Sequence, residues 1–123
     1  MELGELEVYR LARALSKKIW VIYSEMDWHQ KKIIGDQWIR SADSVGANIA
    51  EGFGRYHYLD KNRFNFNARG SLMEVRHWTE LLYERTALNK AYCEEIIQII
   101  QLLGVKLNNY ISSTQQRAES SKK

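Results

Sequence analysis

The stretch IRSADSVGANIAEGFG, from Ile39 to Gly54, decides the fold, because two sets of residues repeat through it at helical spacing. One set is apolar and forms a stripe along one helix face: Ile34, Trp38, Ala42, Val45, Ile49 and Phe53. The other set, which we call the polar ladder, falls within roughly 80° of arc on the neighbouring flank: Gln37, Arg40, Ser44, Asn48, Glu51 and Arg55. Such a helix packs into a core with one face and offers an ordered polar row to a second surface.

The composition is that of one ordinary globular domain. The chain has 123 residues, 45% of them hydrophobic, and it has no proline that would break a helix. Its single cysteine, Cys93, cannot form an internal disulfide, which suits a reducing compartment. No stretch has the pattern of a signal peptide, and the apolar-rich segment from Ile96 to Leu107 is too short to span a bilayer. We therefore expect a cytoplasmic protein that does not enter a membrane.

Hydrophobic periodicity predicts four helices, at about residues 5–26, 31–53, 59–86 and 90–111. Long helices joined by short connections pack with their neighbours antiparallel. The predicted fold is therefore all-α: an antiparallel up-and-down four-helix bundle over residues 1–112, followed by a flexible polar C-terminal tail over residues 113–123. The predicted core face of the third helix consists of Phe64, Ala68, Ser71, Val75, Trp78 and Leu82.

The fourth helix has more apolar side chains than one small bundle covers. Residues 96–111 supply a complete core face, and further apolar residues lie around most of the remaining circumference. Two apolar residues of the first helix also lie off its main stripe. Because exposed apolar patches mark interfaces, we predict a homo-oligomer that buries six residues: Trp20, Val21, Ile97, Ile99, Leu102 and Val105.

Two motifs give the chain a family resemblance. The first is Arg40, Ala42, Ser44 and Val45, then Asn48-Ile49-Ala50-Glu51-Gly52 and Gly54-Arg55; the second is Ala68-Arg69-Gly70-Ser71-Leu72 with Glu74. With these motifs the chain resembles the S23 family, four-helix-bundle proteins encoded in intervening sequences of bacterial 23S ribosomal RNA genes. The same group includes the accessory variability proteins of diversity-generating retroelements. The resemblance implies a left-handed bundle that assembles into a pentameric ring. The retroelement relatives use such a basic ring to bind nucleic acid and a partner reverse transcriptase.

Basic residues are the predicted nucleic-acid contacts. A ring would concentrate the stripe on the first helix into a positive field, for which phosphates are the natural partner. The predicted residues are Arg10, Arg13, Lys17, Lys18, Arg40, Arg55, Arg69 and Arg76. For the stripe the alternative is an ordinary solvated face, and for the polar ladder it is a structural hydrogen-bond network. The connection from Arg55 to Tyr58 either stacks on unpaired bases or packs against a neighbouring helix.

No enzyme signature is complete in this sequence. Glu74 and His77 match the Glu-x-x-His spacing of di-metal bundles, but that chemistry requires a second copy of the motif, which is missing. The glycines lack the Lys-Ser/Thr ending of a phosphate-binding loop. We therefore predict a protein without catalytic residues, metal or cofactor, which binds RNA, DNA or a ribonucleoprotein partner such as a reverse transcriptase. The alternative is a protein-interaction scaffold that binds no nucleic acid, and a metal-binding bundle ranks third.

Overall fold

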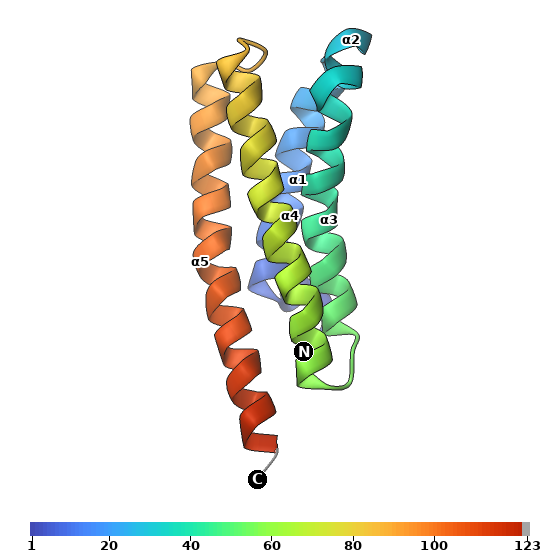
Figure 1. Cartoon of the computed structure of the whole chain (residues 1–123), viewed down its shortest axis with the longest axis vertical. Coiled ribbons are helices and arrows are strands. Elements are labelled where there is room, and N and C mark those ends of the chain that lie inside the picture. The colour runs from blue at the N-terminus through green and yellow to red at the C-terminus, as the bar shows by residue number, and fades with distance from the viewer. Residues whose placement is uncertain (122–123) are drawn as a thin grey trace.

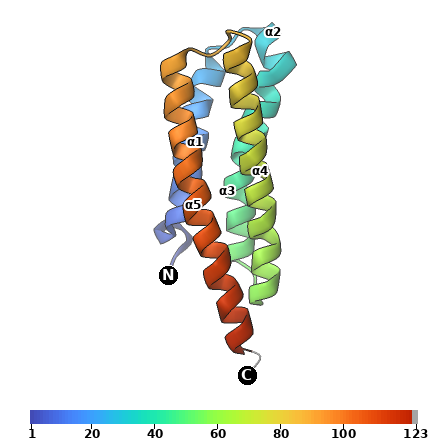
Figure 2. The same ribbon diagram turned by 60° about the vertical axis from the view of Figure 1, so that its left-hand side comes forward.

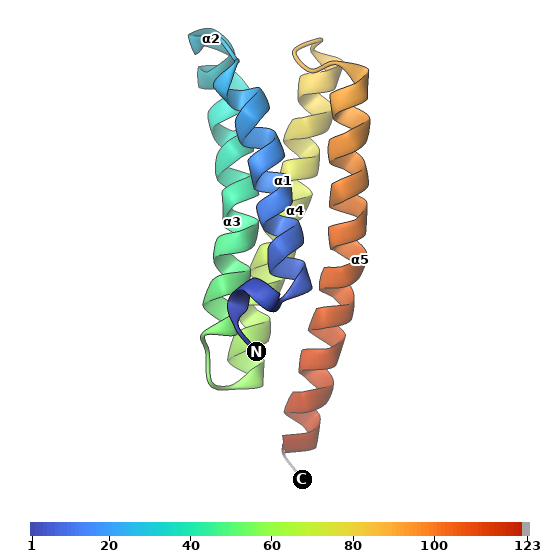
Figure 3. The same cartoon turned by 180° about the vertical axis from the view of Figure 1, so that it is seen from behind.

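The computed structural model describes residues 1–121, and all of its regular elements are helical (Figure 1). These elements are η1 (Leu3–Glu5), α1 (Glu7–Ser24), α2 (Trp28–Gln30), η2 (Lys31–Gly35), α3 (Asp36–Phe53), α4 (Tyr58–Glu84) and α5 (Lys90–Ser121). The four long helices pack as a bundle, and each runs opposite to the one before it (Figure 1). Seen from behind, α1 lies between α3 and α5, so α4 is diagonal to it (Figure 3). The predicted all-α four-helix bundle is confirmed.

The path from α2 to α3 is continuous and contains one π-helical turn, η2. Asp27 begins it with a capping box, in which its carboxylate accepts the Gln30 backbone N–H at 2.8 Å. In η2 the Asp36 backbone N–H bonds to the carbonyl of Lys31, five residues back. A Cβ at Gly35 would lie 2.9 Å from Met26 Sδ and 3.3 Å from the Tyr23 ring, so a larger residue there would force the Met26 side chain to move. The second helix therefore begins at Trp28, three residues before the position predicted from the sequence.

Apolar stripes on all four helices meet in one core. Along α1, α3 and α5 the buried residues repeat at the predicted spacing, as Val8, Leu15 and Ile19 do on α1. On α4 the predicted core face is wrong in part, because Phe64, Ser71 and Trp78 are only half-buried. Their places in the interior belong to Asn62, Asn65, Leu72 and Thr79, which are buried together with Ala68, Val75 and Leu82. The buried face of α4 is therefore rotated about the helix axis toward α5, compared with the core face predicted from the sequence.

Two of the buried polar residues of α4, Asn62 and Thr79, are bonded to other helices, and Asn65 is bonded to Asn62. The Thr79 hydroxyl accepts a hydrogen bond from Trp38 Nε1 at 2.9 Å and donates to the Val75 carbonyl at 2.7 Å. Asn62 Nδ2 donates to the Ile111 carbonyl at 3.0 Å, and Asn65 Nδ2 donates to Asn62 Oδ1 at 3.0 Å. These bonds offset the cost of taking polar groups out of water, so the polar positions specify how α4 meets α3 and α5.

The predicted flexible tail over residues 113–123 is wrong for residues 113–121, which continue α5 to Ser121. The extension projects past the start of α4 at the end of the bundle that carries the α3–α4 connection (Figure 2). Thr114 and Ala118 are buried on the same side as Ile111, so the core-facing stripe of α5 continues with small residues. Residues 122 and 123 lie outside the described part of the chain. No helix within residues 1–121 combines the length and apolarity needed to cross a membrane.

Candidate nucleic-acid interface

Three cations lie on the outer face of α1, away from the core. Arg10, Arg13 and Lys17 are exposed, and within residues 1–121 none of them forms an ion pair with a carboxylate. Arg13 donates to the Tyr9 hydroxyl at 2.9 Å, and its guanidinium lies 5.7 Å from the centre of the Tyr9 ring. These charges therefore remain available to an external anion.

Lys18 differs from the other basic residues of α1, because it forms an ion pair with Glu95 of α5. A second pair between the same two helices joins Lys106 to Glu7 at 3.2 Å. Both pairs are partly exposed to solvent, so each contributes at most about 1 kcal/mol to stability. Lys18 thus belongs to the α1–α5 contact rather than to a free basic surface.

Arg40 lies on the outer side of α3, the helix that packs beside α1, and it is near Tyr23 at the end of α1. It is exposed and without an ion pair among the described residues, and its charge is felt by Tyr23 of α1. The Tyr23 hydroxyl donates to Asp36 at 2.6 Å, and this hydrogen bond, together with burial, raises the pKa of Tyr23. Arg40 is therefore close to the end of α1, on a different helix from the α1 cations.

The polar ladder divides into separate local contacts. Ser44 Oγ is hydrogen-bonded to Ser71 Oγ of α4 at 2.9 Å, and Asn48 Nδ2 donates to the Ser44 carbonyl at 2.9 Å. Gln37 Nε2 reaches only its own helix, at the Ile33 carbonyl. The central part of the ladder thus joins α3 to α4, as the structural alternative requires.

Arg55, at the end of the ladder, is held by two carboxylates. Its guanidinium lies 3.5 Å from Glu51 and 3.7 Å from Asp60, and it stacks 4.7 Å from the centre of the Phe64 ring. Asp60 also pairs with Arg63 at 2.9 Å. Arg55 therefore fixes the start of α4 to the end of α3, and its charge is largely compensated.

Arg69 and Arg76 lie on the α5 side of α4, apart from the α1 cations. Arg69 donates to Asn108 Oδ1 of α5 at 3.2 Å, and Arg76 Nε donates to Glu80 at 2.8 Å. Because α4 is diagonal to α1 in the bundle, the eight predicted basic residues do not form one surface. Arg10, Arg13 and Lys17 share the outer face of α1, Lys18 borders it beside Lys17, and Arg40, Arg55, Arg69 and Arg76 lie on other helices or connections.

The predicted oligomer residues also divide into two groups. Trp20 is 56% exposed and Val21 55%, and they flank Lys17 in the two shallow grooves on either side of it. Leu102 and Val105 are exposed on α5. For Ile97 and Ile99 the prediction of free apolar surface is wrong, because both are half-buried and pack against the core of their own chain.

A second exposed apolar set was not found from the sequence. Leu59, Phe66 and Met73 recur every seven residues on the outer side of α4, and all three are exposed. Gly70 lies among them, and a Cβ added to it would meet no atom within 4 Å. These residues do recur every seven positions in the sequence. The prediction for this helix covered only its core face, which lies on the opposite side of the helix.

The structure also shows the surroundings of Glu74 and His77, which match part of a di-metal motif, and of Cys93, the single cysteine. Glu74 and His77 are exposed on α4, and among residues 1–121 no group of three or more His, Cys, Asp or Glu side chains is arranged so that it could hold a metal ion. Burial raises the pKa of the Cys93 thiol, and the nearby Glu80 and Glu94 raise it further. The thiol of Cys93 is therefore held in its unreactive protonated form.

Comparisons with known proteins agree with this architecture. The family model described as "23S rRNA-intervening sequence protein" matches residues 4–109. A crystal structure from Bacteroides thetaiotaomicron, described as a protein of unknown function from the S23 ribosomal protein family, superposes with a TM-score of 0.79. It is 22% identical in sequence, and the match covers 85% of this chain and 97% of that one. At this identity the likeness shows the shared fold alone. No match was found among curated protein sequences.

Proposed function

This chain belongs to the 23S rRNA-intervening sequence protein family, and we propose that it acts by binding rather than by catalysis. In this proposal a homo-oligomer, a pentameric ring, binds RNA, DNA or a ribonucleoprotein partner through the outer face of α1. The observation that carries the proposal is that three exposed cations of α1 form no ion pair within residues 1–121: Arg10, Arg13 and Lys17. Binding to phosphates would release counterions, so the affinity would fall steeply with salt and depend little on sequence.

The charge of a single copy is too small to support tight binding. The formal net charge is only +3, and several basic residues are neutralised by ion pairs. Assembly would supply the missing field, because each copy adds the same cations to a shared surface. The exposed Trp20 and Val21 flank Lys17, so an interface that buries them would bring α1 cations of neighbouring copies close together.

Charge reversal on α1 tests this proposal. We expect the wild-type protein to bind labelled RNA or DNA at low salt, and the Arg13→Glu/Lys17→Glu variant to bind far more weakly. In the variant the slope of log affinity against log salt should fall by about 2 for each copy whose α1 face contacts the nucleic acid, one unit for each lost phosphate contact. The matched control is Arg85→Glu/Lys90→Glu, which makes the same charge change at the exposed α4–α5 turn. Fluorescence anisotropy over a salt series measures both quantities.

The second candidate function is a protein-interaction scaffold, for instance for a reverse transcriptase. It is favoured by the exposed seven-residue repeat of Leu59, Phe66 and Met73 on α4, which the bundle itself leaves uncovered. If a correctly assembled oligomer binds no nucleic acid at low salt, the nucleic-acid proposal fails and the scaffold remains. Equal loss of binding in the α1 variant and its control would also contradict the proposal.

A further inference from the structure

The connection between α3 and α4 carries three consecutive aromatic residues on a backbone that is fixed at both ends. Lys61 Nζ donates to the Phe53 carbonyl at 2.9 Å, so it caps the end of α3 from the first turn of α4. Arg55 bridges Glu51 and Asp60 across the same connection. The rings of Tyr56, His57 and Tyr58 are therefore presented by a braced segment, which lowers the entropy cost of ordering them around a ligand.

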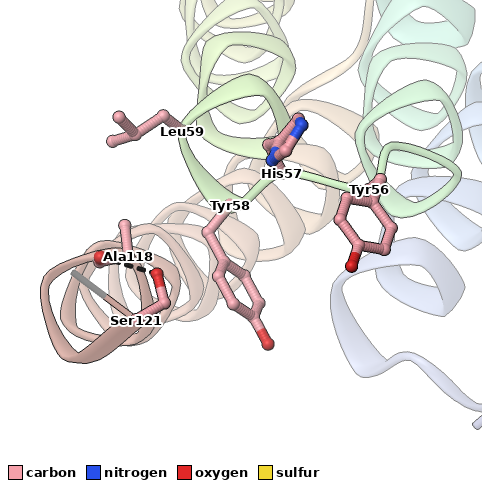
Figure 4. Close-up of a pocket in the computed structure, with 6 residues that line it drawn as sticks. All are labelled: Tyr56, His57, Tyr58, Leu59, Ala118 and Ser121. Carbon is pink, nitrogen blue, oxygen red and sulfur yellow. Dashed lines mark hydrogen bonds between the residues drawn. The ribbon is translucent and has the colours of Figure 1, made fainter. Parts of the chain in front are cut away.

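The last turns of α5 face this connection across a groove. The groove has a volume of about 500 Å³ and is lined by Tyr56, His57, Tyr58, Leu59, Ala118 and Ser121 (Figure 4). The rings of Tyr56 and Tyr58 project to the same side of the connection, and Tyr58 lies between Tyr56 and α5 (Figure 4). This volume is within the range of roughly 300–1,000 Å³ that is typical of small-ligand sites.

Tyr56 is an exposed aromatic residue of the groove, and little of its surface is used within the chain. Its side chain is 89% exposed. The centre of its ring lies 5.0 Å from that of His57, with the planes at 89°, so the two rings meet edge to face. In such a contact the edge of one ring meets a face of the other, so at least one flat face of Tyr56 stays open. A planar ligand that stacks there would remove apolar surface from water without displacing a protein group.

Cations lie next in sequence to residues that line the groove: Arg55 precedes Tyr56, and Arg117 precedes Ala118. Burial lowers the pKa of Lys61, and the nearby positive charge of Arg117 lowers it further, which places a cation of α5 close to a cation of α4. Arg63 is exposed one turn along α4, where Asp60 compensates it in part. The groove thus combines exposed rings with neighbouring cations, the two features by which proteins hold single-stranded nucleic acid.

We propose that this groove binds an unpaired base of single-stranded nucleic acid, which stacks on Tyr56 while the adjoining phosphate lies toward the exposed Arg117, next to Ala118 of the groove. The proposal rests on the proposed function and adds to it the ligand class, because bases inside a duplex are already stacked and cannot reach the ring. Every base has a flat face, so the site selects unpaired strands without reading their sequence.

The test compares single-stranded and fully paired oligonucleotides with the oligomeric protein and two variants of Tyr56. The Tyr56→Ala variant should bind a single-stranded oligonucleotide about 5- to 100-fold more weakly than wild type, the range expected for loss of one stacked base. Affinity for a blunt duplex should stay unchanged. Tyr56→Phe is the matched control and should bind as wild type does, since it keeps the ring. RNA and DNA strands are measured separately, and circular dichroism checks that each variant is folded.

Each outcome separates this site from the general proposal. If Tyr56→Ala binds single strands as tightly as wild type while Arg13→Glu/Lys17→Glu does not, the groove proposal is overturned and the α1 surface stands. If Tyr56→Ala weakens single-strand and duplex binding equally, base stacking is not the cause and the groove proposal is again overturned. If the wild-type oligomer binds neither form at low salt, both proposals fail together.

Discussion

At the scale of single residues, one buried hydrogen bond joins two helices in the centre of the core. Trp38 and Thr79 are fully buried, and the Trp38 indole N–H donates to the Thr79 hydroxyl. A buried donor without a partner costs more than the net gain of the bond itself, because its hydration is lost and nothing replaces it. Thr79 thus acts mainly by satisfying an atom on another helix.

We expect Thr79→Val, which keeps the shape and removes the hydroxyl, to lower the free energy of unfolding by about 1–3 kcal/mol. Urea denaturation followed by Trp fluorescence measures the change. Thr79→Ser is the control, since it retains the hydroxyl and should be less destabilising than Thr79→Val. If Thr79→Val is as stable as wild type while Thr79→Ser is destabilised, methyl packing rather than the hydrogen bond is the important contribution of Thr79.

The Tyr23–Asp36 hydrogen bond predicts a pH dependence of stability. Because the bond to Asp36 raises the pKa of Tyr23, the neutral phenol is favoured in the folded state. This contribution is fully present below the ordinary tyrosine pKa of about 10 and is lost as the pH rises through the raised value. The denaturation midpoint of Tyr23→Phe should therefore lie below that of wild type at pH 7–9, and the difference should shrink above pH 10. A difference that does not vary with pH would contradict this explanation.

The buried residues show what local patterns can and cannot predict. Spacing alone identified the core positions of α1, α3 and α5, because apolar residues repeat there at the helical period. It missed Asn62 and Thr79 because their partners are remote: Asn62 is bonded to Ile111 and Thr79 to Trp38. From the sequence alone a polar residue is predicted to be exposed, because its remote hydrogen-bond partner is not known.

At the scale of the elements, two glycines within helices have opposite roles. A Cβ at Gly52 of α3 would lie 2.9 Å from the Lys61 carbonyl and 3.2 Å from Phe64 Cβ, so the glycine permits the close approach of α4. At Gly70 of α4 the same addition meets open space. Within one chain Gly70 only weakens its helix, because glycine loses more backbone entropy on folding than alanine.

We expect Gly52→Ala to destabilise the fold by about 1–3 kcal/mol, since α3 and α4 must move apart. Gly70→Ala should stabilise it by about 0.5–1 kcal/mol. Thermal denaturation of the two variants beside wild type measures both effects. A stability loss in Gly70→Ala, together with weaker self-association, would show that another copy approaches the outer side of α4.

The end of α5 shows why helix length was misjudged. Residues 113–121 contain Ser, Gln and charged residues, a composition typical of a tail. Only Thr114 and Ala118 keep the core-facing positions occupied, and both are small and weakly apolar. The buried positions therefore repeat at helical spacing. Thr114 and Ala118 are too weakly apolar, however, for this repeat to be recognised within a polar segment.

At the scale of the whole molecule, exposed apolar residues argue for self-association. Val21 and Val105, on α1 and α5, each expose more than half of their side chains. We expect Val21→Glu/Val105→Glu to shift the protein from oligomer to monomer, because each carboxylate would be buried without a partner. Met73→Glu on α4 is the matched control and should leave assembly intact. Sedimentation velocity over a concentration series distinguishes these outcomes, and a monomeric wild-type protein at high concentration would contradict the proposed ring.

The candidate site was less predictable from the sequence than the fold. All eight basic residues were identified, but their availability depends on neighbours that only the packed molecule brings close. Lys18 is neutralised by Glu95 of a different helix, which no local pattern indicates. The pairs Arg55–Glu51 and Arg76–Glu80 are visible as charges four residues apart and could have been discounted beforehand.

The π-helical turn η2 makes the orientation of the corner at Trp28 depend on the exact number of residues in the turn. A π-turn contains one residue more than the α-helical turn it replaces, so an in-frame deletion of one codon within residues 31–34 would restore an uninterrupted α-helix. Everything from Asp36 onward would keep its register, while Trp28 would swing about the helix axis by roughly 100°. Insertions and deletions at this point could therefore redirect the corner during evolution and leave the rest of the fold untouched.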